Sequence, residues 1–172
     1  MNIKFLVALS LFIMFTSCKQ KQETNLSDSK DKNTSKGIIE KDLSKLNYIE
    51  FTLDEKTKKA IIDWNEYNEL QSIVTNVKKG NLSYFDNDGD PIKELIKNSK
   101  QTIPTAVNSD ATLARITALE TKLYKLESSS NLSTTSKKEL IETIKEFLES
   151  FSNLNFQMNK KLEKENQNIE KP

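Results

Sequence analysis

The chain has 172 residues, of which 26 are Lys or Arg and 25 are Asp or Glu, so its charge gives no reason to expect nucleic-acid binding. The absence of histidine removes the commonest general base and transition-metal ligand, and a single cysteine excludes an intrachain disulfide and a cysteine-based zinc site. We therefore expect one folded domain, no enzyme activity and no cofactor.

Residues 1–17 have the features of a secretory signal peptide. Lys4 supplies a short positive region, and Phe5–Phe15 is an apolar stretch too short to cross a bilayer as a helix. The following residues, Phe15-Thr16-Ser17-Cys18, resemble the lipobox of bacterial lipoproteins. That resemblance implies diacylglycerol on the thiol of Cys18, cleavage before it and acylation of the new amino terminus. The alternative is an ordinary cleaved signal peptide that ends near a cysteine.

Residues 18–42 are predicted to form the lipidated cysteine and a flexible polar tether. Lys, Gln, Ser, Asp, Asn and Thr dominate this segment, which therefore cannot bury enough apolar surface to order itself. The alternative is that part of the segment docks on the folded body, and Gly37-Ile38-Ile39 is the best candidate for that. We expect the folded domain over residues 43–166 and a disordered tail over residues 167–172.

The first long helix is predicted from Leu53 to Lys79. Thr52 and Glu55 have the spacing of a capping box, and Gly80 suits a left-handed helix stop. Its apolar residues recur at helical spacing and are expected to be buried. These are Ile61, Trp64, Tyr67, Leu70, Val74 and Val77, widened by Ile62 and Ile73.

A second helical region is predicted to begin at Asp90-Pro91, to be interrupted at Pro104 and to resume after Asp110. Ser136 is expected to cap the last helix. The strongest apolar stripes of these regions are Thr112, Ile116, Leu119, Leu123 and Leu126, and then Leu140, Ile144, Phe147, Phe151, Leu154, Met158 and Leu162. Because short connections make neighbouring helices antiparallel, we predict an all-α, up-down-up bundle of three long helices whose middle member is broken near Pro104, which gives three to four helices in all.

The connection before Pro91 contains a possible cation site. Asp86, Asp88 and Asp90 have the spacing of the first three ligands of an EF-hand loop. However, Pro91 stands where that loop needs glycine, and Lys97 stands where it needs a bidentate glutamate. We predict a polar turn without a resident metal, and weak, millimolar-class Ca2+ binding is the alternative.

Tyr84 and Phe85 lie in the same connection and are expected to be exposed, which makes them candidates for binding a partner protein. Arg115, the only arginine, flanks an apolar stripe and is expected to clamp neighbouring helices. A row of glutamates in the last helix is expected to form a solvated face. It consists of Glu139, Glu142, Glu146 and Glu149.

Four short segments resemble a group of uncharacterised envelope lipoproteins of gram-negative bacteria. They are Ile103-Pro104, Ala114-Arg115-Ile116, Leu119-Glu120-Thr121-Lys122 and Phe151-Ser152-Asn153-Leu154-Asn155. The resemblance covers roughly Trp64 to Lys161 together with the lipobox, and its motifs are mostly helix-seam residues. It implies an anchored helical module at the cell envelope, and it supplies no activity and no catalytic residues.

From these observations we expect a membrane-anchored envelope lipoprotein, in the outer membrane, that presents a helical interaction or scaffold module to another envelope protein. The alternative is an envelope lipoprotein that binds a small ligand, or Ca2+ weakly, through the Asp86–Asp90 loop.

Overall fold

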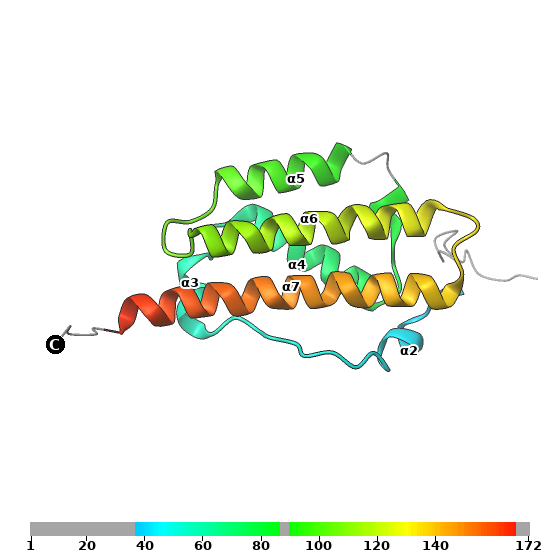
Figure 1. The fold of residues 1–172 in the computed structure, drawn as a ribbon, viewed down its shortest axis with the longest axis horizontal. Helices are drawn as coiled ribbons and strands as arrows, with labels where there is room; N and C mark the ends of the chain where they lie inside the picture. Colours follow the sequence, from blue (N-terminus) through cyan, green and yellow to red (C-terminus); the bar gives the residue numbers. More distant parts are fainter. Residues whose placement is uncertain (1–36, 87–89, 168–172) are drawn as a thin grey trace, which may run out of the picture. The chain divides into compact units, whose positions relative to one another are not determined.

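The computed structural model describes residues 37–86 and 90–167. The chain divides into two units, Met1–Asp31 and Lys32–Pro172, and every described residue belongs to the second. The described part is all-helical, with six α-helices, a 3-10 helix and no strand (Figure 1), so the predicted all-α class is confirmed. None of its helices is both long and apolar enough to span a bilayer.

The region predicted as one helix from Leu53 to Lys79 forms two, α3 (Glu55–Ala60) and α4 (Asn65–Lys78). The cap of α3 is Asp54, whose side chain accepts a 2.7 Å hydrogen bond from the Thr57 amide, so the predicted cap at Thr52 is wrong. Ile62 lies in the break between the helices and is 69% exposed, although it was expected in the core. The break lets α3 contact α7 while α4 contacts both α5 and α7.

Gly80 ends the first helical region as predicted, with a φ of +81°. A Cβ atom at this position would lie 3.0 Å from the carbonyl oxygen of Ile38. The glycine is therefore required both by its left-handed backbone and by the close approach of the N-terminal segment.

The packed body begins earlier than the boundary predicted at residue 43. Ile38 is only 1% exposed, and the short helix α2 (Glu40–Leu43) ends at Leu43, which is 6% exposed. Lys137 holds this segment by an ion pair to Asp42 (2.7 Å) and a hydrogen bond to the Gly37 carbonyl (3.0 Å). The last part of the predicted tether therefore docks on the body, while residues 18–36 lie outside the described residues.

Helices α5 (Asp90–Gln101) and α6 (Asp110–Asn131) form a hairpin around Pro104. Figure 1 shows α6 returning alongside α5 in the opposite direction, so they are not two pieces of one broken rod. Ser109 caps α6 by accepting a 3.1 Å hydrogen bond from the Thr112 amide.

The last helix, α7 (Lys137–Asn166), is capped as predicted by Ser136, which accepts a hydrogen bond from the Glu139 amide. Helices α4 to α7 run alternately in opposite directions (Figure 1), each contacts the next, and α4 also contacts α7. This closed arrangement of four helices differs from the predicted three-helix bundle, which is not confirmed. The predicted stripe residues of α6, from Thr112 to Leu126, are all buried at 0% exposure.

Candidate functional site

Two of the predicted site residues, Cys18 and Asp88, lie outside the described residues. Asp86 and Asp90 are exposed. Among residues 37–86 and 90–167, no group of three or more cysteine, aspartate or glutamate side chains is arranged to hold a metal ion. The Ca2+ interpretation of this loop therefore remains a sequence-based prediction.

The prediction that Tyr84 and Phe85 are both exposed is wrong for Phe85. This ring is 0% exposed and packs edge-on against Phe147, with 6.4 Å between ring centroids. The 3-10 helix η3 (Ser83–Asp86) turns Phe85 into the core, where Asn131 donates a 2.8 Å hydrogen bond to its carbonyl. Tyr84 is half-buried and donates a hydrogen bond to Glu69 (3.3 Å), and burial raises the pKa of its hydroxyl. The pair does not form an exposed aromatic surface.

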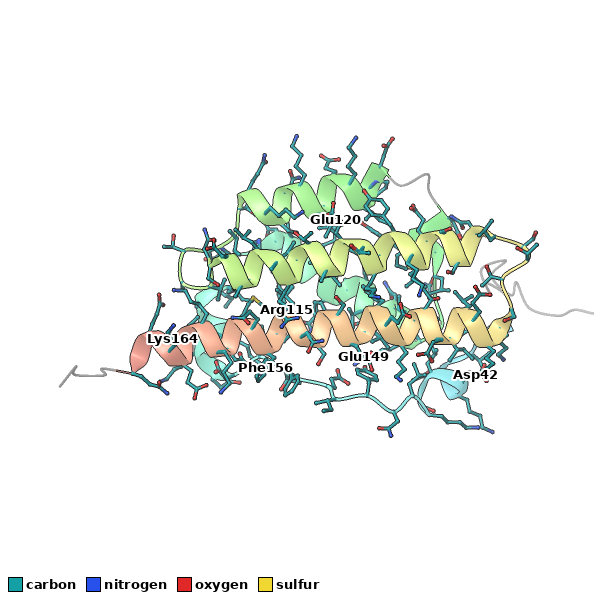
Figure 2. The ribbon with its side chains drawn as sticks, viewed as in Figure 1. Asp42, Arg115, Glu120, Glu149, Phe156 and Lys164 are labelled. Carbon is teal, nitrogen blue, oxygen red and sulfur yellow. The ribbon has the colours of Figure 1, made fainter. Side chains whose placement is uncertain are left out.

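Helices α6 and α7 are joined by charged residues other than Arg115, which was predicted to clamp neighbouring helices. Arg115 is exposed and lies on α6 (Figure 2). Within the described part of the chain its guanidinium makes no ion pair or hydrogen bond. Instead, Lys125 (2.7 Å) and Lys122 (3.0 Å) on α6 both bind Glu146 on α7. These two ammonium groups lower the pKa of the Glu146 carboxyl. Glu146 therefore joins two helices, although it was expected on a solvated face.

Between α2 and α3, residues 47–54 form a segment without regular structure, here called the strap, which runs along α7 (Figure 1). Three side chains of α7, here called the polar ladder, bind it: Ser152, Asn155 and Asn159. Their spacing of three and four residues places them on one face of the helix.

The polar ladder makes five hydrogen bonds to main-chain atoms of the strap. Ser152 Oγ accepts from the amide of Phe51 (2.6 Å) and donates to the carbonyl of Ile49 (2.9 Å). Asn155 Nδ2 donates to the Phe51 carbonyl (3.0 Å). Asn159 Nδ2 donates to the Thr52 carbonyl (2.8 Å), and its Oδ1 accepts from the Asp54 amide (3.1 Å). Every bond is long-range in sequence and none uses a strap side chain.

Asn155 also joins the strap to α4. Its Oδ1 accepts a 2.9 Å hydrogen bond from the hydroxyl of Tyr67, and the two residues are 5% and 4% exposed. Burial raises the pKa of the Tyr67 hydroxyl, which therefore remains a neutral donor at physiological pH. The ring of Tyr67 stacks on Phe151 of α7 at 5.6 Å, so this side-chain amide lies where three elements meet.

Exposed apolar groups accompany the strap. Ile49 is 72% exposed, and the half-buried Phe51 packs on Phe156, which is 37% exposed and lies on α7 (Figure 2). The two ring centroids are 4.6 Å apart, and Lys160 Nζ lies 5.7 Å from the Phe156 ring centroid. We call Ile49, Phe51 and Phe156 the strap face. Aromatic rings next to a cation are typical anchors of a protein interface.

The strap ends in an open groove of about 360 Å³ between α3 and α4. Its buried lining includes Leu53, Ile61 and Tyr67, and its rim includes the exposed Lys59 and Ile62. Apolar and charged side chains both line the groove, and none of the three residues of the strap face is among them.

Comparisons with protein-family models, with curated proteins and with solved structures find no match. The function is therefore argued from the sequence and the geometry of this chain alone. The polar ladder had a signal in the sequence, because Ser152, Asn155 and Asn159 are polar residues beside the apolar stripe of α7. The sequence does not identify the main-chain groups to which these three side chains bind, which lie about a hundred residues earlier in the chain.

Proposed function

We propose that this chain is a lipid-anchored lipoprotein of the bacterial envelope, in the outer membrane, that acts through protein contacts and without catalysis. The observation that carries the proposal is the position of Cys18, the single cysteine, which directly follows an apolar segment and the small residues Thr16 and Ser17. Several acyl chains on one residue would give stable anchoring, because each buried CH2 contributes about 0.8 kcal/mol. The polar residues that follow would serve as a tether.

The helical body supports a role in contacts. The most exposed large apolar residue among those the structure describes, Ile49, lies two residues before Phe51, whose ring packs on Phe156. The polar ladder fixes the backbone that carries Ile49 and Phe51. Irregular backbone on a rigid helical scaffold is where binding residues commonly lie. The strap face is therefore a better candidate for the contact surface than the Tyr84–Phe85 segment, in which one ring is committed to the core.

Fractionation of cells that produce the chain tests the anchor. We expect the wild type in the membrane fraction, with an intact mass that shows acyl chains on residue 18, because a lipobox cysteine is acylated. The matched variant Cys18→Ala should move to the soluble fraction with an unchanged melting temperature, since residue 18 precedes the packed body. A wild-type chain that is soluble and unmodified would contradict the proposal.

A further inference from the structure

We propose that the polar ladder of α7 is a peptide-binding site, and that an extended segment of a partner protein, with an acidic residue directly before an aromatic one, replaces the strap there. This inference rests on the proposed contact function and names its partner chemistry. The strap itself shows what the site binds, because residues 49–54 are an extended segment already bound to it.

The ladder recognises backbone rather than sequence. All five of its hydrogen bonds end on amides or carbonyls of the strap, so an extended segment of another chain offers the same groups. Peptide-recognition sites that add a strand work in this way, with main-chain hydrogen bonds for affinity and a few side-chain contacts for selectivity.

Besides Tyr48 and Leu53, which pack with the core of this chain, two side chains of the strap contact the helices and define the preferred sequence. Glu50 forms an ion pair with Lys78 of α4, and Phe51 packs on Phe156 of α7. A lysine on one side and an exposed ring on the other therefore select an acidic residue followed by an aromatic residue. Ile49 makes little contact, with 72% of its surface exposed, so the position before the acidic residue is unselective.

The strap is poised to leave without unfolding the core. From Ser44 to Thr52 no residue is buried, whereas Leu43 and Leu53 on either side are 6% and 8% exposed. The segment between these two anchors can therefore open as a loop, at the cost of exposing the half-buried side chains of Leu46, Tyr48 and Phe51, the first two of which pack against the core. Its main-chain groups become hydrated when it opens. Opening would free Ser152, the Asn155 amide group that binds Phe51, and the ring of Phe156, whereas the Asp54 amide, which follows the Leu53 anchor, would keep its bond to Asn159.

A peptide-binding measurement on the full-length chain, isolated in detergent micelles, tests the inference. The probe is a fluorescent peptide of residues 47–54, Asn-Tyr-Ile-Glu-Phe-Thr-Leu-Asp. The double variant Glu50→Ala/Phe51→Ala weakens the strap and leaves the ladder intact. We expect it to bind the peptide at least tenfold more tightly than the wild type, because the competing segment in the same chain is weakened. The single variant Glu50→Ala, at an exposed residue, should also bind the peptide more tightly than the wild type, by a smaller factor.

Two controls decide whether the gain comes from the ladder. Adding Ser152→Ala and Asn159→Ala to the strap-weakened chain should abolish the gain. A peptide with alanine in place of Glu50 and Phe51 should bind the strap-weakened chain more weakly than the native peptide does, because it keeps the main-chain groups but loses both side-chain contacts. Circular dichroism melts establish that each variant is folded. The inference would be overturned if the peptide bound all folded variants equally, or if it bound neither the single variant Glu50→Ala nor the double variant Glu50→Ala/Phe51→Ala. A wild-type dimer that dissociates when the strap is weakened would also overturn the inference, because the occupant of the polar ladder would then be a second copy of this chain. None of these results depends on where the chain fractionates in cells.

Discussion

Replacing Phe147 by alanine should lower the free energy of unfolding by about 3–5 kcal/mol, a large part of the 5–15 kcal/mol typical of a domain. The ring is 0% exposed and lies against Phe85, which is equally buried. The substitution leaves a cavity between the helices, and their close packing prevents them from collapsing fully into it. The lost burial of the ring and the remaining cavity therefore both lower the free energy of unfolding. Urea denaturation followed by circular dichroism measures the loss.

Phe156→Ala is the matched control, because it makes the same chemical change in the same helix at a ring that is 37% exposed. We expect it to lower the free energy of unfolding by less than about 1.5 kcal/mol, since the ring is partly exposed and lies against the half-buried Phe51 and the exposed Lys160. Equal losses for the two variants would show that the observed burial does not describe the core of the protein.

Asn155→Ala should lower the free energy of unfolding by about 2–4 kcal/mol. The substitution removes the acceptor of the Tyr67 hydroxyl and the donor to the Phe51 carbonyl, both at a site that is 5% exposed. An unpaired buried polar group costs about 1–3 kcal/mol, and the hydroxyl that loses its acceptor belongs to Tyr67, a side chain only 4% exposed. Chemical denaturation of the purified chain measures the change.

A double-mutant cycle with Tyr67→Phe separates this hydrogen bond from general loss of packing. In the Tyr67→Phe background no hydroxyl is left unpaired, so Asn155→Ala should cost about 1–2 kcal/mol less than in the wild type. Additive losses in the cycle would contradict the assignment of Asn155 as the acceptor of the Tyr67 hydroxyl.

The regular parts of the fold were predictable because their signals are local. The apolar stripes of α6 and α7 recur at the helical period, and the serines at positions 109 and 136 accept hydrogen bonds from amides three residues later, as helix caps do. Gly80 could also be predicted as a helix stop, because a positive φ at the end of a helix favours glycine.

The break between α3 and α4 depends on a tertiary contact and so escaped prediction. Trp64 is 2% exposed, and its indole donates a 3.2 Å hydrogen bond to Thr102 beyond the end of α5. Trp64 is the residue directly before α4, which begins at Asn65, and Ile62 in the turn between the two helices faces solvent. The helical spacing of the apolar residues continues across this break and therefore does not predict it.

The position of the strap was equally hidden, because it has no periodicity of its own. Its extended backbone is fixed by side chains of α7 that lie 101 to 107 residues later in the chain. A polar residue beside an apolar stripe predicts a hydrogen bond, but only the tertiary structure identifies its partner. For the same reason the burial of Phe85 follows from how η3 packs on α6, and composition gives no sign of it.

Native-state hydrogen exchange at the amide of Phe51 tests most directly whether the strap is an exchangeable occupant of the polar ladder. This amide donates to Ser152 Oγ, so it should exchange more slowly than in a free peptide. Its exchange should nevertheless occur by local opening, with a rate that low concentrations of urea hardly change, whereas the amide of Leu119 in α6 should exchange only by global unfolding. If the Phe51 amide instead shows the same opening free energy and urea dependence as Leu119, the strap cannot leave without unfolding the body, and it is a permanent part of the fold.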